Sequence, residues 1–317
     1  MELRQSSNKT IVVGRLMDME VTTGITKKGD GYISVTLIVN SLIDGKENEN
    51  EIQLFATEKS KLHKSYSTIA NEYKTAKLVG KDNADRIRVD GELVFDKYVQ
   101  AKTGKISITR KIRGTFVNRI DKPEIVDEVG AEVECVVKGF KNETDKDGIE
   151  TGRLQVDLLS IGYNNAINEF QRVFVSSELA TVFPTVYNVG DTAEFVLNVF
   201  NYSESKEETE EVEETVGFGQ GLNNKTNSFK NYINEINLIG GKMPICDEGK
   251  FYTTEEVAYM ETLIKLKNNE LMGEADKKNN TSTSNNQGMA FGQGLGGGQK
   301  TPENPAKETI EDEDIPF

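Results

Sequence analysis

The stretch that decides the fold is YISVTLIVNS at residues 32–41, which is followed by EIQLFATE at residues 51–58. Apolar and polar side chains alternate in both, which is the period of a β-strand with one buried face. The positions predicted to face the core are Ile33, Val35, Leu37, Val39, Ile52, Leu54 and Ala56. Tyr32 and Phe55 fall on the opposite, outward set. Two neighbouring strands with outward aromatic rings are therefore predicted.

The flanking sequence extends this pattern through the first 122 residues. Residues 11–23 predict an earlier strand, and residues 86–100 and 105–120 predict two later strands around an AKTG turn. Between them, residues 59–85 carry apolar side chains at helical spacing. Three strands, a helix and two strands is the order of the OB-fold, a five-stranded Greek-key barrel. We therefore predict an OB-fold over residues 1–122.

The second half repeats the strand pattern and supports a mainly β protein. Its predicted strands are residues 132–140, 153–163, 169–176, 192–202 and 229–239. We predict a second, OB-like β-barrel over residues 126–245. A different β-barrel stays open here, because no sequence identity links the two halves. The acidic and Gly/Asn-rich residues 204–228 predict a disordered insertion between its last two strands.

The C-terminal part is predicted to hold one helix and a tail. Residues 246–272 contain the helix, which begins with a capping box formed by Thr253 and Glu256. Residues 273–317 are rich in Asn, Ser, Gln and Gly and carry few large apolar side chains. Such a segment buries too little surface to offset its ordering entropy, so we predict a disordered tether.

Composition argues against most classes of enzyme. The chain has one histidine and two cysteines, which excludes multi-histidine metal centres and four-cysteine zinc sites. We therefore expect no catalytic residues, no metal and no cofactor. The absence of a long apolar run predicts no membrane span. The chain also lacks a secretory signal near residue 1, which predicts a cytoplasmic protein of a bacterial type.

Charge is distributed unevenly between the two predicted barrels. The net charge is −14 overall, but it is +6 over residues 1–122 and −9 over residues 123–203. The N-terminal barrel is thus the candidate binder of a polyanion. An OB-fold binds a single nucleic-acid strand across its second and third β-strands and between the flanking loops. The bases stack on aromatic rings, and cations lie along the phosphates.

We predict DNA-binding side chains from this geometry and from strand alternation. The aromatic candidates are Tyr32, Phe55 and Tyr98, and the cationic candidates are Arg15, Arg86, Arg88, Lys97, Lys102, Lys105, Arg110, Lys111 and Arg113. Tyr66 and Tyr73 fall on the apolar side of the predicted helix and are assigned to the core. For each single aromatic candidate, packing against a loop or helix is the competing interpretation.

The last seven residues form a separate motif. Four carboxylates precede an apolar end in the order Glu311, Asp312, Glu313, Asp314, Ile315, Pro316 and Phe317. Pro316 keeps the end extended, and Phe317 joins a ring to a carboxylate. This combination suits a small apolar pocket with an arginine at its mouth on a partner protein.

The motif, the Gly/Gln/Asn-rich tether and the basic N-terminal barrel resemble bacterial and phage single-stranded DNA-binding proteins. The resemblance implies an OB-fold that binds single-stranded DNA, and a tip that recruits replication, recombination and repair proteins. It also implies the cytoplasm of a bacterial or phage-infected cell. The chain departs from the usual family plan by its second, acidic barrel, and a second copy of the chain is a further candidate partner.

Two other hypotheses remain open at this stage. The first is a replisome or recombination adaptor that does not bind DNA and whose barrels bind protein; burial of Tyr32, Phe55 and Tyr98 would favour it. The second concerns regulation, since the carboxylates at 204–214 and 311–314 could fold back on the basic barrel until DNA displaces them.

Overall fold

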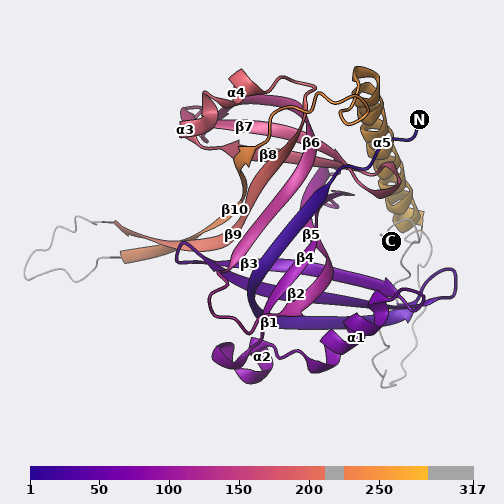
Figure 1. Ribbon diagram of the computed structural model, residues 1–317, viewed down its shortest axis with the longest axis vertical. Helices are drawn as coiled ribbons and strands as arrows, with labels where there is room; N and C mark the ends of the chain where they lie inside the picture. The colour runs from indigo at the N-terminus through magenta and orange to yellow at the C-terminus, as the bar shows by residue number, and fades with distance from the viewer. Residues whose placement is uncertain (211–224, 285–317) are drawn as a thin grey trace, which may run out of the picture.

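The computed structural model describes residues 1–210 and 225–284 of the chain. Its strands form two barrels that share a ten-stranded sheet (Figure 1). The strands of the first barrel are β1 (Asn8–Ile25), β2 (Gly31–Ile43), β3 (Lys46–Thr57), β4 (Arg86–Val99) and β5 (Ile106–Arg119). Their order is β1-β2-β3-β5-β4, and β4 pairs back with β1. The predicted OB-fold is confirmed.

Strand alternation places the core of this barrel where the sequence predicts it. Ile33, Val35, Leu37, Ile52 and Leu54 are buried. The barrel is closed by the parallel pairing of β3 with β5, in which Ile52 lies opposite Ile112. Helix α1 (Leu62–Glu72) contacts β2 and β3 from its place between β3 and β4. The short helix α2 (Ala76–Val79) and a 3₁₀ turn (Lys81–Asn83) follow before β4.

The second barrel has the same strand topology as the first. Its strands are β6 (Glu128–Thr144), β7 (Glu150–Ile161), β8 (Ile167–Val175), β9 (Thr192–Glu210) and β10 (Lys225–Gly241). Their order is β6-β7-β8-β10-β9, closed by the pairing of β6 with β9, and β8 runs parallel to β10. A 3₁₀ turn (Tyr163–Asn165) lies between β7 and β8, and helices α3 (Ser177–Ala180) and α4 (Phe183–Val186) lie between β8 and β9.

A strand pairing and the N-terminal segment help to hold the barrels together. β1 pairs antiparallel with β6, so that one strand from each barrel continues the same sheet. The N-terminal segment then crosses the second barrel, where Leu3 packs in a cluster with Met260 and Ile264. The Arg4 guanidinium forms an ion pair with Glu134, whose side chain is 8% exposed.

Helix α5 (Thr254–Ser284) is longer than predicted. Its capping box is confirmed: the Thr253 N–H donates to Glu256 Oε2 at 2.8 Å, and the Glu256 N–H donates to Thr253 Oγ1 at 3.3 Å. Met260 and Ile264 are buried side chains on one face of its first half. The predicted boundary at residue 272 is wrong, because the helix continues to Ser284 without the apolar stripe that marked its first half.

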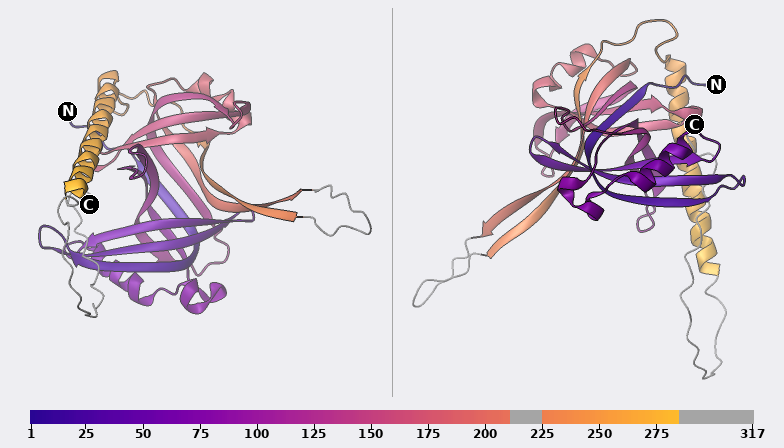
Figure 2. Two further views of the ribbon diagram at one scale, coloured as in Figure 1. Left: turned by 180° about the vertical axis from the view of Figure 1, so that it is seen from behind. Right: turned by 60° about the horizontal axis from the view of Figure 1, so that its bottom comes forward.

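The predicted disorder from residue 204 is also wrong where the structure describes the chain. β9 continues to Glu210 and β10 begins at Lys225, and the two pair along a ribbon that projects from the barrels (Figure 2). We call this ribbon, residues 203–210 and 225–232, the arm. Cross-strand pairing, such as Ser203 opposite Tyr232, overrides the low β-propensity of the acidic sequence. Residues 211–224 lie outside the described residues.

The buried side chain of Tyr66 should make the free energy of unfolding depend on pH in the alkaline range. Tyr66 is 1% exposed, its hydroxyl donates to the Thr115 carbonyl at 3.1 Å, and burial raises its pKa from 10.0 to about 12. Above pH 10 this phenol ionises in the unfolded chain before it ionises in the folded one, so the free energy of unfolding decreases. Tyr66 alone should remove about 1.4 kcal/mol per pH unit between its two pKa values.

Urea unfolding at pH 8 and pH 11 tests this prediction. Tyr66→Phe should be less stable than the parent by about 1 kcal/mol at pH 8, because the hydroxyl hydrogen bond is lost. Its stability should also fall less between the two pH values. Equal falls in the parent and the variant would contradict the assignment, and the other tyrosines cancel in this comparison.

Candidate functional site

The candidate site is the outer face of the first barrel, formed by the outward side chains of β2, β3, β5 and β4. Strand register brings these side chains together: Ser34 lies opposite Phe55, and Gln53 lies opposite Arg113. We define the outer face by Tyr32, Gln53, Phe55, Asp96, Tyr98, Lys111 and Arg113. Six of these seven come from one continuous set of strands, β3-β5-β4, and Tyr32 extends it onto β2.

Two aromatic rings stack on this face. The ring centroids of Tyr32 and Phe55 are 5.3 Å apart, with an interplanar angle of 28°. Tyr32 is only 6% exposed, and its ring also covers Gly24 on β1, where a Cβ would lie 2.7 Å from ring atoms. Phe55 is half-buried. Tyr32 therefore supports Phe55, and Phe55 is the ring of this pair that a ligand reaches more easily.

A charged trio lies beside the aromatic pair. Lys111 Nζ is 2.9 Å from Asp96, and Arg113 is 3.2 Å from the same carboxylate. Each of the three side chains is about one-third exposed. Because two cations share one carboxylate, the trio keeps a net positive charge at the surface. Burial raises the pKa of Glu92, which pairs with Arg113 across the strands, and the positive charge of Arg113 opposes that rise.

Loops adjoin the outer face at both ends. The β4–β5 loop follows Tyr98, which is 48% exposed, and carries the exposed residues Lys102 and Lys105. The β1–β2 loop precedes Tyr32 and carries the exposed residues Lys27 and Lys28. Our sequence analysis missed these last two, although the KKGD turn between two predicted strands was the signal that could have found them.

Three predicted cations lie away from the outer face and are engaged by the protein itself. The Arg15 guanidinium donates to the carbonyls of Lys81 and Ala84 at 2.7 and 3.1 Å. Arg86 forms an ion pair with Asp127 in the segment between the barrels, and Arg88 is 2.8 Å from Asp90. The structure therefore does not bring these three arginines together with Phe55.

Two more predicted cations, Lys97 and Arg110, lie at the junction of the barrels. Lys97 is 11% exposed, forms an ion pair with Glu169 of β8, and donates to Asn268 of α5 at 2.8 Å. Arg110 donates to the carbonyls of Phe200 and Glu235 at 3.3 and 3.2 Å, and burial lowers its pKa to about 10.

This location differs from the prediction, and the alternation of the strands explains it. Along β4 and β5, Lys97 and Arg110 alternate with Asp96, Tyr98 and Lys111 and so point to the opposite face. The second barrel and α5 cover that face. The sequence shows the alternation but not what covers each face.

The corresponding face of the second barrel is closed by its own side chains. Phe174 of β8 is 4% exposed, and the Arg153 guanidinium lies 4.4 Å from its ring centroid. Arg153 is in turn paired with Glu143 at 2.6 Å and Glu235 at 3.0 Å, and the hydrogen bond with Glu143 lowers the pKa of that carboxyl. Arg153 is thus already paired with carboxylates and the Phe174 ring is already covered, in contrast to Phe55 in the first barrel.

Two other features, a cluster that could hold a metal ion and a membrane-spanning helix, were sought among residues 1–210 and 225–284. In these residues no group of three or more His, Cys, Asp or Glu side chains could hold a metal ion. No helix in the same part of the chain is long and apolar enough to cross a membrane. The tip, residues 311–317, lies outside the described residues.

Comparison with known proteins gives one family and several structural likenesses. A family model described as YorF matches residues 6–278. No curated protein matches the chain. The wild-type single-stranded DNA-binding protein of Thermus aquaticus is similar over 78% of this chain and 98% of its own, with 12% identity and a TM-score of 0.44.

Two smaller proteins are similar over about one barrel. The mitochondrial single-stranded DNA-binding protein Rim1 of S. cerevisiae matches 37% of this chain and 96% of its own, with 15% identity and a TM-score of 0.24. A small single-stranded DNA-binding protein of Streptomyces coelicolor matches 36% of this chain and 94% of its own, with 12% identity and a TM-score of 0.24.

Proposed function

This chain belongs to the YorF family, and for this member we propose a function as a sequence-independent single-stranded DNA-binding protein. In this proposal the single-stranded DNA lies on the outer face of the first barrel. The observation that carries the proposal is the stacked pair of Tyr32 and Phe55 on the outer face of β2 and β3 of an OB-fold. Rings on this face offer stacking surfaces that every base can use.

The neighbouring cations suit a phosphate backbone. Lys111 and Arg113 lie beside the rings with a net positive charge, and Lys102 and Lys105 are exposed next to Tyr98. Cations along a strand release condensed counterions on binding, so affinity falls as salt rises and does not depend on base sequence.

We assign DNA binding to the first barrel rather than to the second. The ring of Phe174 is covered and Arg153 is paired with two carboxylates, so binding there would have to break ion pairs first. The net charges support this assignment, since residues 1–122 carry +6 and residues 123–203 carry −9.

The proposal includes a role without catalysis in replication, recombination or repair, in the cytoplasm of a bacterial or phage-infected cell. The acidic residues 311–314 and the apolar residues 315–317 resemble the tip through which single-stranded DNA-binding proteins recruit partners. Such a tip would bring partner proteins to the strand that the first barrel holds.

Fluorescence-anisotropy titration of a labelled dT oligonucleotide, over a salt series and with a duplex competitor, tests the function. We expect tight binding to dT that weakens with salt and that duplex does not displace. No binding at low salt would overturn the proposal. It would favour the adaptor hypothesis instead, for which the burial of Tyr32 under its neighbours is the supporting observation.

A further inference from the structure

The arm is a two-stranded ribbon that leaves the second barrel. It extends β9 and β10 beyond the closed barrel and projects away from both barrels (Figures 1 and 2). A two-stranded ribbon alone is marginally stable in water, and its edges leave backbone groups unpaired. An arm of this kind gains stability when it meets another surface.

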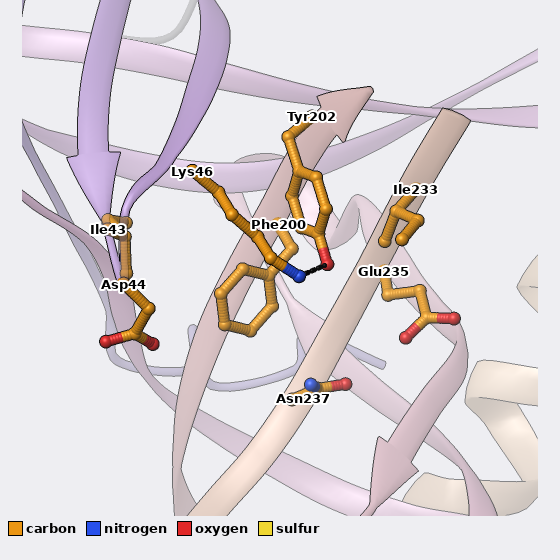
Figure 3. A pocket seen from close by; sticks show the side chains of 8 residues that line it. All are labelled: Ile43, Asp44, Lys46, Phe200, Tyr202, Ile233, Glu235 and Asn237. Carbon is orange, nitrogen blue, oxygen red and sulfur yellow. Dashed lines mark hydrogen bonds between the residues drawn. The ribbon is translucent and has the colours of Figure 1, made fainter. Parts of the chain in front are cut away.

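The base of the arm is fixed by the first barrel. Lys46, in the β2–β3 hairpin, donates to the Tyr202 hydroxyl at 2.9 Å (Figure 3). It also donates to Glu204 at 2.6 Å. The hydrogen bond to Glu204 is the main reason that the pKa of Lys46 is raised. The Asn201 side chain also donates to the Glu49 carbonyl at 2.6 Å. These contacts set the direction in which the arm points.

That direction carries the arm away from the basic loops of its own chain. The β1–β2 loop and α5 lie on the side of the molecule opposite the arm (Figures 1 and 2). From Glu204 to Glu210 the ribbon advances about 20 Å, at roughly 3.3 Å per residue, and it does so outward. The contact within one chain that the sequence suggested is therefore not the contact that this geometry favours.

The charge of the arm complements the outer face of the first barrel. The two strands of the arm and the residues between them, 203–232, hold seven carboxylates and three lysines, a net charge of −4. The outer face and its loops carry Lys111 and Arg113, with Lys102 and Lys105 exposed beside Tyr98. The negatively charged arm would be attracted to the outer face by the same cations that would attract phosphates.

We propose that the arm of one molecule docks on the outer face of the first barrel of a second copy of this chain, and that single-stranded DNA displaces it. The competition rests on the proposed function, because it requires that DNA bind the same face. The contact joins two different surfaces, so each molecule offers one arm and one face, and the resulting assembly is head-to-tail.

Two variants of the full chain test the contact. In the first, residues 206–229 are replaced by Asn-Gly, a two-residue turn that closes the hairpin at Ser205 and Lys230 and keeps the contacts of Lys46. In the second, the chain keeps its length and six carboxylates are changed to Gln, three in the arm (Glu207, Glu208 and Glu210) and three in the sequence that follows it (Glu211, Glu213 and Glu214). A control variant changes six exposed glutamates elsewhere to Gln, at Glu124, Glu178, Glu248, Glu261, Glu270 and Glu274.

Sedimentation velocity over a range of protein concentrations at low salt, without DNA, is the first measurement. We expect the parent and the control to self-associate and both arm variants to remain monomeric. Anisotropy with the dT oligonucleotide is the second. The arm variants should bind dT about three- to tenfold more tightly than the parent at low salt, and the difference should shrink at high salt.

The outcomes separate this proposal from the proposed function. Equal self-association of the parent and both arm variants would overturn the arm contact and leave dT binding untouched. Arm-dependent self-association in a parent that does not bind dT would support the arm contact and overturn the proposed function. Self-association that dT does not reverse would overturn the competition, because arm and strand would then occupy different surfaces.

Discussion

Phe55→Ala should weaken binding of the dT oligonucleotide by about 5- to 150-fold, which corresponds to the roughly 1–3 kcal/mol that one stacked base contributes. Phe55 is half-buried and its ring lies against Tyr32, so its removal takes away the more accessible ring of the pair. The change leaves the cations of the outer face in place. The salt dependence of binding should therefore keep its slope while the affinity falls at every salt concentration.

Phe116→Ala is the matched control for this prediction. Phe116 is also a phenylalanine on a strand of the first barrel, it is 59% exposed, and it pairs with Asp90 of β4. We expect its removal to leave dT affinity within about twofold of the parent, since it lies outside the stacking surface. Equal losses in Phe55→Ala and Phe116→Ala would contradict the assignment of the outer face.

Lys97→Met should reduce the free energy of unfolding by about 3 kcal/mol or more, because it leaves Glu169 as a buried carboxylate without its main partner. Glu169 is 5% exposed, and Lys138, at 3.4 Å, is the other cation within reach. Urea unfolding at pH 7 measures the loss. The affinity of the folded variant for dT should be unchanged, because Lys97 lies at the junction of the barrels rather than on the outer face.

The double variant Lys97→Met/Glu169→Met separates the lost ion pair from lost packing. Replacing both members of a buried pair by apolar side chains of similar size is often neutral, so most of the stability should return. If the double variant is as unstable as Lys97→Met, the buried charge is not the cause. If Lys97→Met binds dT more weakly while fully folded, Lys97 contacts the strand after all.

The sequence was sufficient to predict the first barrel because its strands have one buried face. Alternation at Ile33, Val35, Ile52 and Leu54 fixes which side chains point inward, and the position of one helix between the third and fourth strands distinguishes the OB-fold. The second barrel followed the same order, although its strands extend further than their composition suggested.

The site was predicted less completely than the fold. Alternation shows toward which face of the sheet a side chain points, but it does not show which part of the protein covers that face. Phe55 and Tyr32 were placed on the outward face, and both lie there. The burial of Tyr32 depends on Gly24, which β1 brings under its ring and which is distant in sequence. Lys97 and Arg110 were predicted to bind DNA, whereas the second barrel covers the face from which they project.

The boundaries that were wrong share a physical cause. The acidic residues after Tyr202 have low β-propensity, and composition alone therefore predicted disorder there. A strand already paired in a barrel can continue outward, since each added residue finds its partner on β10 at little further entropic cost. The C-terminal extension of α5 has the same origin, because a helix nucleated by packing needs only local bonds to grow.

The contact of Leu3 with Ile264 has a consequence for synthesis of the protein on the ribosome. Leu3 precedes β1 in the chain, and the cluster that buries it combines Leu159 and Ile161 of β7 with Met260 and Ile264 of α5. β1 can meet β2, β4 and β6 in turn as each one is translated. The segment before β1 can dock on β7 through the Ser6 N–H and the Ile161 carbonyl, but burial of Leu3 is completed only when α5 is translated.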